Sequence, residues 1–157
     1  MANTSIALAY RRSAMMNASK VTAKPPSEDV LQARDNFAAF CKLMGKPPAK
    51  HMLEWHNQLC TGEDSECLMG IAGPNTSILA PRGSAKSTVL GLFAAWMIGR
   101  HAVAKKMLRI LYIAYMVDIS RAKSATIKGI LTSAKYREIF PMVRLSKIKR
   151  SDEYWSI

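Results

Sequence analysis

Hydrophobic positions in the first half of the chain recur with helical spacing. Val30, Phe37 and Cys41 are separated by seven and four residues, which places them on one face of a helix. We therefore predict a helix over residues 28–44. A second helix is predicted from about residue 49 to residue 60, where a less polar face recurs with similar spacing.

Short apolar runs in the second half predict strands instead. The longest, LRILYIAYMV, is continuous and rich in β-branched and aromatic residues, which is typical of a strand covered on both faces of a parallel sheet. The four predicted strands lie at residues 67–73, 76–81, 108–117 and 153–157.

Two helices are predicted between these runs. The stretch 86–98 is apolar nearly all round, which indicates a helix buried on most sides and ended by Gly99. The other helix extends from about residue 119 to 135, with Asp118 as its N-cap. The order strand, helix, strand, helix predicts an α/β fold: a parallel sheet flanked by helices and preceded by N-terminal helices.

Composition narrows the class of protein. The 157 residues are 49% hydrophobic, so the chain can bury a core, and the net charge of +12 favours a polyanionic partner over the alternative that lysines only maintain solubility. The three cysteines have spacings that fit neither a zinc site nor a disulfide framework. We expect free thiols in a reducing compartment and no metal site built on protein side chains.

The segment SILAPRGSAKSTVLG contains the main candidate for chemistry. It follows the phosphate-loop pattern G-x-x-x-x-G-K-[ST], but Ala80 and Ala85 occupy the two glycine positions. Lys86 and Ser87 match the pattern, and Gly83 is available for a conformation that other residues resist. At the two alanines we expect ordinary backbone angles or a small strain.

The alternative is a strand-to-helix turn that carries a surface lysine. Lys86 at the start of so apolar a helix would be repelled by the positive end of the helix dipole. A bound polyphosphate removes that objection, because it is attracted by both the lysine and the dipole. The residues therefore favour a phosphate site.

The stretch LAPRGSAKST resembles the Walker A segment of large terminase subunits, the ATP-driven motors that package DNA into tailed-phage heads. The sequence ILYIAYMVDISRAKSATIKGILTSAKYREIFP resembles the terminase segment that follows Walker A, and FAAFCKLMGKPPAKHMLEWHNQL resembles the segment before it. The resemblance covers roughly residues 35 to 157. Composition indicates a flexible basic arm at 1–27, which contains no acid and ends at Pro25-Pro26, and the helical patterns indicate an N-terminal helical region at 28–66. The resemblance implies that 67–157 is the first part of a P-loop ATPase domain.

The resemblance implies ATP and Mg²⁺ as cofactors. Lys86 would bind the β/γ-phosphates, Ser87 would hold Mg²⁺, and Arg82 would match the loop arginine, so that Arg82 and Lys86 would act in catalysis. The remaining phosphate contacts would come from Thr88 and the backbone N–H groups of Gly83, Ser84 and Ala85. Trp55, His56 and Gln58 lie where such motors carry an adenine-recognition segment; the alternative for Trp55 is helix packing.

The family also implies partners and a location. Double-stranded DNA, the portal protein, the small terminase subunit and copies of the chain in a ring would be its partners, in the host cytoplasm and transiently at the portal vertex. The acidic Walker B motif and the nuclease domain of the family would lie beyond Ile157, because Asp118 is explained as a cap. A truncated product, a split gene with a second polypeptide carrying Walker B and nuclease, and a deliberately shortened chain stay open. We expect ATP binding without useful hydrolysis by this chain alone.

Residues 105–150 hold twelve cations and two acids, which accounts for most of the excess charge. The cations are Lys105, Lys106, Arg109, Arg121, Lys123, Lys128, Lys135, Arg137, Arg144, Lys147, Lys149 and Arg150. A DNA-gripping face and a solvated helix face are both consistent with this pattern. Two other functions also stay open: a different P-loop NTPase or kinase fragment, and a non-enzymatic basic nucleic-acid-binding module.

Overall fold

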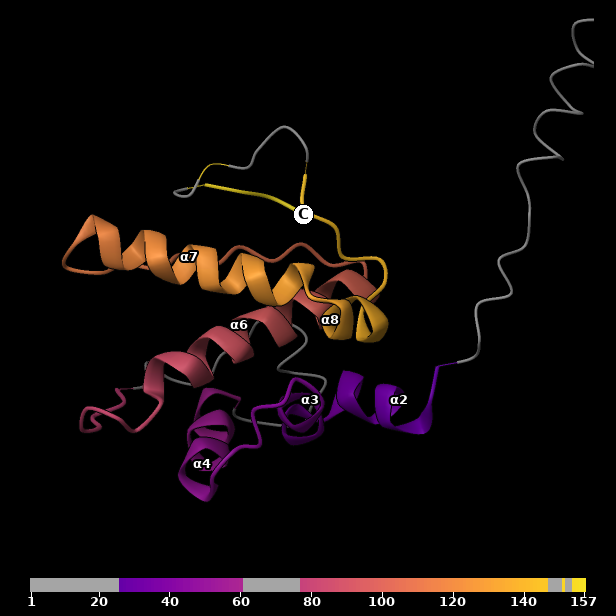
Figure 1. Cartoon of the computed structure of the whole chain (residues 1–157), viewed down its shortest axis with the longest axis horizontal. Coiled ribbons are helices and arrows are strands. Elements are labelled where there is room, and N and C mark those ends of the chain that lie inside the picture. Colours follow the sequence, from indigo (N-terminus) through magenta and orange to yellow (C-terminus); the bar gives the residue numbers. More distant parts are fainter. Residues whose placement is uncertain (1–25, 61–76, 147–150, 152–153) are drawn as a thin grey trace, which may run out of the picture.

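The computed structural model describes residues 26–60, 77–146, 151 and 154–157. Helices make up 59% of these residues, and no strand or sheet occurs among them. Figure 1 shows three tiers: α7 and α8 on one side, α6 in the middle, and α2, α3 and α4 on the other side. No helix in the described part is long and apolar enough to cross a membrane.

The predicted parallel sheet is wrong for the described residues. Residues 77–80 and 106–114 are extended, but neither segment pairs as a strand. Near the C-terminus, Trp155 makes only an isolated bridge, with the Ser146 N–H donating to the Ser156 carbonyl at 2.9 Å. The predicted strand at 67–73 lies outside the described residues. An apolar run can therefore have an extended backbone without a neighbouring strand to complete a sheet.

The predicted helix at 28–44 is divided in two, α2 (Glu28–Asp35) and α3 (Phe37–Leu43). The break is at Asn36, whose side chain accepts a hydrogen bond from the Ala39 N–H and so caps α3. The helix predicted at 49–60 is confirmed as α4 (Lys50–Leu59). Apolar periodicity continues across Asn36, which is why the break does not show in the pattern.

The long central helix α6 (Lys86–Val103) is buried along most of its length, as its composition predicts. The prediction that Gly99 ends it is wrong. Gly99 lies inside α6, and the ring of Phe140 packs directly on its backbone. A Cβ at this position would lie 2.5 Å from the Phe140 Cγ and Cε2 atoms. This glycine serves close packing between helices instead of chain reversal.

One core joins the N-terminal helices to the rest. In the described part, two fully buried side chains donate hydrogen bonds across it: Trp96 Nε1 to the Ala33 carbonyl at 3.1 Å, and the Tyr136 hydroxyl to the Ala95 carbonyl at 2.8 Å. All four of these residues are fully buried. They connect α6 to α2 and to α8 (Ala134–Ile139), so the start of α6 is held by a packed scaffold.

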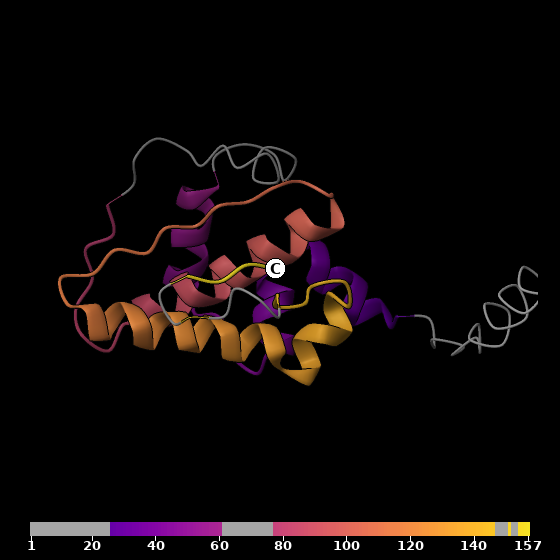
Figure 2. The same ribbon diagram turned by 90° about the horizontal axis from the view of Figure 1, so that it is seen from above.

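The helix predicted at 119–135 is present as α7 (Val117–Thr132), followed by α8. Its N-cap is Met116, so the prediction that Asp118 caps it is wrong. Figure 2 shows how residues 104–116 return along α6 to the start of α7, so that α6 and α7 begin at the same end of the molecule. In the described part, the chain therefore runs from one helix through a return segment to a second helix, without forming a sheet.

Candidate functional site

The loop before α6 has the backbone of a tight, left-handed turn. Gly83 has φ +86° and Ala85 has φ 58°, so both lie in the left-handed region. Glycine adopts this conformation at little cost, whereas for alanine it costs about 1–2 kcal/mol. Of the two outcomes expected for Ala85, the strained one is present, and Ala80 has no positive φ. The turn aims the chain into α6 within a few residues.

The first turn of α6 leaves several backbone donors unused. Thr88 N–H and Val89 N–H both donate to the Ala85 carbonyl, at 2.9 and 3.0 Å. The N–H groups of Ala85, Lys86 and Ser87 have no hydrogen-bond partner among the described residues. No side chain caps this end of the helix, and its first turn contains no acid. Such a terminus, with open donors and a positive dipole end, favours an anion.

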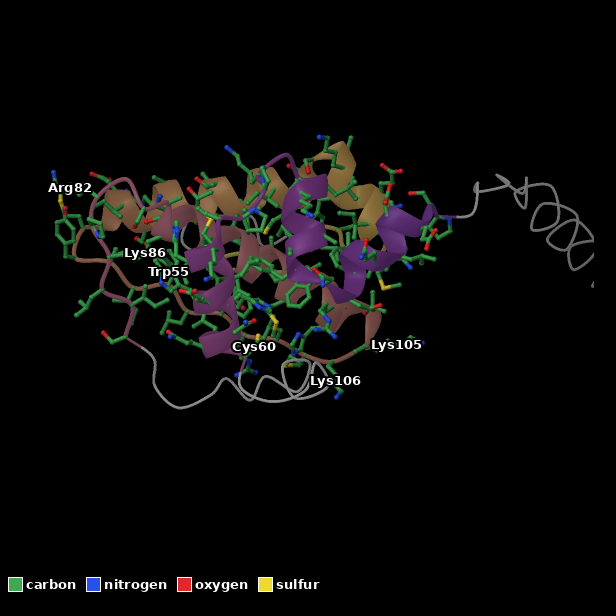
Figure 3. The ribbon with its side chains drawn as sticks, turned by 90° about the horizontal axis from the view of Figure 1, so that it is seen from below. Trp55, Cys60, Arg82, Lys86, Lys105 and Lys106 are labelled. Atoms are coloured by element: carbon green, nitrogen blue, oxygen red, sulfur yellow. The ribbon has the colours of Figure 1, made fainter. Side chains whose placement is uncertain are left out.

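The side chains around this terminus add positive charge and hydroxyls. Lys86 is half-buried at the first position of α6, and Ser87 and Thr88 are exposed beside it. Arg82 is exposed in the loop. In Figure 3, Arg82 and Lys86 lie at one end of the molecule, and Lys105 and Lys106 lie at the other. The loop residues that the sequence singled out thus lie at the first turn of α6 or just before it.

Ser84 is oriented differently from its neighbours. Its hydroxyl donates to the Pro81 carbonyl at 2.9 Å, and its N–H group points at the same carbonyl from 3.4 Å. The second distance lies beyond the usual range of an N–H hydrogen bond, so it is a weak contact. A phosphate would compete with it for the Ser84 N–H group.

Helix α4 packs against the loop from the N-terminal side. His51 Nε2 lies 3.4 Å from the Ser84 carbonyl, and the His51 ring meets Trp55 edge to face with centroids 4.9 Å apart. The sequence did not reveal this contact, since 33 residues separate His51 from Ser84. The amphipathic pattern of α4 predicts that one face of this helix is packed, but it does not identify the segment against which that face packs.

Two of the three residues predicted to recognise adenine, Trp55 and His56, pack against the core. His56 stacks on Phe37 with ring centroids 4.7 Å apart, and it also meets Phe93 and Trp96 edge to face at 5.7 and 5.5 Å. Trp55 packs partly buried against the same core. These contacts explain both rings by packing. Gln58 is exposed on α4.

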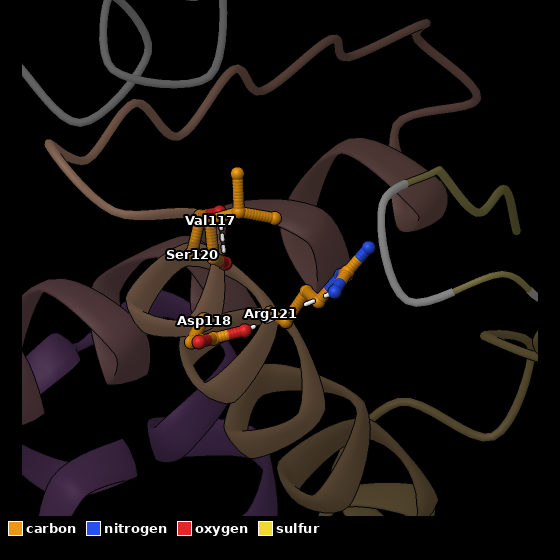
Figure 4. A network of polar contacts seen from close by, with 4 residues as sticks. All are labelled: Val117, Asp118, Ser120 and Arg121. Carbon is orange, nitrogen blue, oxygen red and sulfur yellow. Dashed lines mark hydrogen bonds and ion pairs between the residues drawn. The ribbon is translucent and has the colours of Figure 1, made fainter.

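Asp118 lies in the first turn of α7, where Figure 4 shows its surroundings. Its side chain is 84% exposed and lies 3.8 Å from Arg121 Nη1, while the Ser120 hydroxyl donates to the Val117 carbonyl at 2.8 Å. An acid at this position complements the dipole of α7. Local helix electrostatics explain Asp118 without a catalytic role, although it is not the cap that the sequence predicted.

A cavity of about 350 Å³ opens beside the start of α6. Its lining includes Ser87 and Gly91 of α6 and Ile127 of α7. Leu108, Ile110 and Tyr112 of the return segment also line it. Most of the lining is apolar, and its polar members are Ser87 of α6 and Lys123 and Thr126 of α7. The sequence predicted a strand over this surface, and the structure places the same residues there as a single extended segment.

Cysteine and metal chemistry add little to the site. Cys41 is a buried free thiol, whereas Cys60 is disulfide-bonded, so the expectation of free thiols is wrong for Cys60. Among the residues described, no group of three or more His, Cys, Asp or Glu side chains could hold a metal ion. Any Mg²⁺ at the loop would therefore depend on the Ser87 hydroxyl and on the phosphates themselves.

The chain matches no protein-family model, no curated protein and no solved structure. The case for a function therefore rests on the loop and on α6.

Proposed function

We propose that the chain binds the phosphates of ATP with Mg²⁺ at the loop 81–85 and the first turn of α6. The open N–H groups of Ala85, Lys86 and Ser87 carry this proposal, because they converge on an uncapped helix end with no acid in the first turn. Lys86 supplies the ammonium that pairs with the β/γ-phosphates. The Ser87 hydroxyl holds Mg²⁺, and Thr88 and Arg82 add contacts at the rim.

The left-handed turn also supports a phosphate site. Residues at positive φ are common in turns whose backbone N–H groups bind anions, and Gly83 and Ala85 both have positive φ here. Strain at Ala85 is typical of a functional position, where the backbone conformation matters more than its cost. The proposal uses this loop and α6 alone, and needs no parallel sheet.

We further propose that the chain is the ATP-binding segment of a DNA-packaging motor of the large-terminase type. This step rests on the resemblance of the loop and of the segments around it. Double-stranded DNA is its polyanionic partner, and nine of the twelve cations of 105–150 lie in the described part, most of them exposed. These cations would bind the phosphates of the DNA backbone, and the affinity would fall steeply as the salt concentration rises.

Hydrolysis is not expected from this chain alone. Asp118, the single acid that directly follows an apolar run, is exposed and paired with Arg121. A motor of this kind needs one carboxylate for Mg²⁺ and another for the attacking water. We therefore expect ATP to bind and to remain intact. Robust turnover that Lys86→Ala abolishes would contradict this expectation.

The binding test compares cations at the two ends of one helix. Isothermal titration with Mg²⁺-ATP should give saturable binding to the wild-type chain, and Lys86→Ala should weaken it roughly 10- to 100-fold, since one charge-assisted contact is lost. Lys105→Ala is the matched control, because it removes an exposed cation just beyond the C-terminal end of α6. Equal losses in the two variants would show that ATP is held by general charge, and would contradict the proposed site.

Ser87→Ala separates the metal from the phosphates. If Ser87 holds Mg²⁺, wild type binds ATP more tightly with Mg²⁺ than with EDTA, and Ser87→Ala removes most of that difference. Unchanged Mg²⁺ dependence in Ser87→Ala would exclude Ser87 as the metal ligand.

A further inference from the structure

The segment 107–115 has the side-chain pattern of a β-strand, and no described residue pairs with it as a neighbouring strand. Leu108, Ile110 and Tyr112 line the cavity against α6 and α7. The intervening side chains point away from it: Leu111 is 84% exposed and Ile113 is 80% exposed. Period-two alternation of this kind defines the two faces of a strand. Apart from Arg109, both faces are apolar here, whereas a lone surface segment normally has one polar face.

Within the described part of the chain, the backbone of this segment is also unpaired. Residues 107–115 make no backbone hydrogen bond to any other described residue. Rows of unpaired N–H and C=O groups along extended, apolar chain form a template for pairing with another strand. Proteins usually blunt such an edge with charges, proline or a bulge, but residues 110–117 contain neither a charge nor a proline.

The charges of the segment indicate which strand it accepts. Its cations, Lys105, Lys106 and Arg109, all lie at its N-terminal end, and Asp118 follows its C-terminal end. Parallel pairing of two copies in register would place Arg109 beside its own copy. Antiparallel pairing places the cationic end of each copy beside the uncharged end of the other, close to Asp118. Opposite ends complement each other in the antiparallel arrangement, and like charges are kept apart.

We propose that two copies of this chain pair through residues 107–115 as antiparallel strands related by a two-fold axis. A register with Leu111 opposite its own copy places Ile113 beside the Arg109 stem and Tyr115 beside Met107 on the outer face. It keeps the cavity-lining side chains of both copies on the inner face, against their own helices. Such an interface is self-complementary and closes at two copies. The proposal does not depend on phosphate binding at α6.

Light scattering coupled to size exclusion tests the state of the full chain. Antiparallel pairing predicts twice the mass of one chain, with dissociation on dilution and no larger species. A monomer at every concentration would overturn the proposal, and so would open-ended assembly that grows with concentration.

Two exposed leucines provide matched variants. Leu111→Lys places two lysines opposite each other and should raise the dimer Kd roughly tenfold or more. Leu79→Lys changes a leucine that is 94% exposed outside the segment, and should leave the dimer unchanged. Neither side chain is buried, so both variants should keep the helical circular dichroism of the wild type. An unaffected Leu111→Lys dimer, or equal loss in both variants, would contradict the proposed interface.

Proline distinguishes backbone pairing from simple association of apolar side chains. Leu111→Pro removes one N–H donor, whereas Leu111→Ala shortens the side chain and keeps the donor. If strands pair, Leu111→Pro weakens the dimer much more than Leu111→Ala does. If the two variants weaken it equally, the contact involves side chains alone and the strand-pairing proposal is wrong.

Discussion

Gly99 offers a direct test of how closely α6 packs on the end of α8. Replacing Gly99 with alanine adds one methyl group inside a helix. In an open helix this change stabilises the fold by about 0.5–1 kcal/mol, because glycine is the more flexible residue in the unfolded chain. At Gly99 the added Cβ would lie 2.5 Å from the Phe140 Cγ and Cε2 atoms, and it would also meet Cδ2.

The loss of stability expected for Gly99→Ala depends on how far the ring of Phe140 can move. Carbon atoms in ordinary contact are about 3.5–4.0 Å apart, so the ring would have to move by about 1 Å or more. Phe140 is fully buried, with the rings of Tyr136 and Phe40 at centroid distances of 5.3 and 6.3 Å. Overpacking of this kind costs about 1–3 kcal/mol, which exceeds the propensity gain. We expect Gly99→Ala to lower the free energy of unfolding by about 1–2 kcal/mol.

Urea unfolding followed by far-UV circular dichroism measures this change. Gly91→Ala is the matched control on the same helix, since its Cβ would lie 4.0 Å from Ile127 Cγ1, an ordinary contact. It should be neutral or stabilising by up to about 1 kcal/mol. Adding Phe140→Leu to Gly99→Ala should recover part of the loss by making room. A Gly99→Ala protein as stable as Gly91→Ala would refute the packing argument.

Three further predictions concern stability. Lys105 has φ 53° just after α6, where its N–H donates to the Ala102 carbonyl and the N–H of Lys106 donates to the His101 carbonyl. Glycine adopts this left-handed conformation at less cost, so Lys105→Gly should raise the free energy of unfolding by about 1 kcal/mol in the same urea assay. Tyr136→Phe removes the buried hydrogen bond to Ala95 and should lower the free energy of unfolding by about 0.5–1.5 kcal/mol; no loss would mean that the bond is dispensable. Burial raises the pKa of Cys41 from 9.0 to about 12, so its contribution to stability is full below pH 9 and is lost as the pH rises toward 12, by up to about 1.4 kcal/mol per pH unit. Urea titrations below and above pH 9 should show a shallower alkaline loss in Cys41→Ala than in the wild type.

Local signals predicted the helices well, and their ends less well. The apolar content of 86–98 was sufficient to predict that α6 is buried. The role of Gly99 could not be predicted from the residues near it, because this role depends on Phe140, which lies 41 positions further along the chain. A glycine near the end of an apolar run can close a helix or allow close packing, and only the packing partner decides between them.

The strand predictions failed for a related reason. Residues 108–114 of the predicted strand lie outside any helix, and the alternate side chains of Leu108, Ile110 and Tyr112 line the cavity against α6 and α7. The end of the predicted strand is wrong, because α7 already begins at Val117. A sheet also needs neighbouring strands, and residues 77–80, the other predicted strand in the described part, do not pair with it. Periodicity reports the conformation of one segment and does not report its partners.

Much of the candidate site could be predicted, because the loop and α6 are adjacent in sequence. The order of Gly83, Lys86 and Ser87 was enough to place a turn, a cation and a hydroxyl at a helix start. The contact between His51 and the Ser84 carbonyl could not be predicted, since it joins segments 33 residues apart. The ring contacts of His56 with Phe37 and Phe93 could not be predicted for the same reason, because they join segments far apart in the sequence.

The most direct test of phosphate binding follows the backbone N–H groups themselves. In an amide-resolved NMR titration with Mg²⁺-ATP, the account predicts the largest shift changes at Ala85, Lys86 and Ser87, and loss of these changes in Lys86→Ala. Inorganic triphosphate should move the same three signals, because the phosphates make the proposed contacts. Shifts confined to Lys105, Lys106 and the other exposed cations, or no shifts at all, would contradict the account.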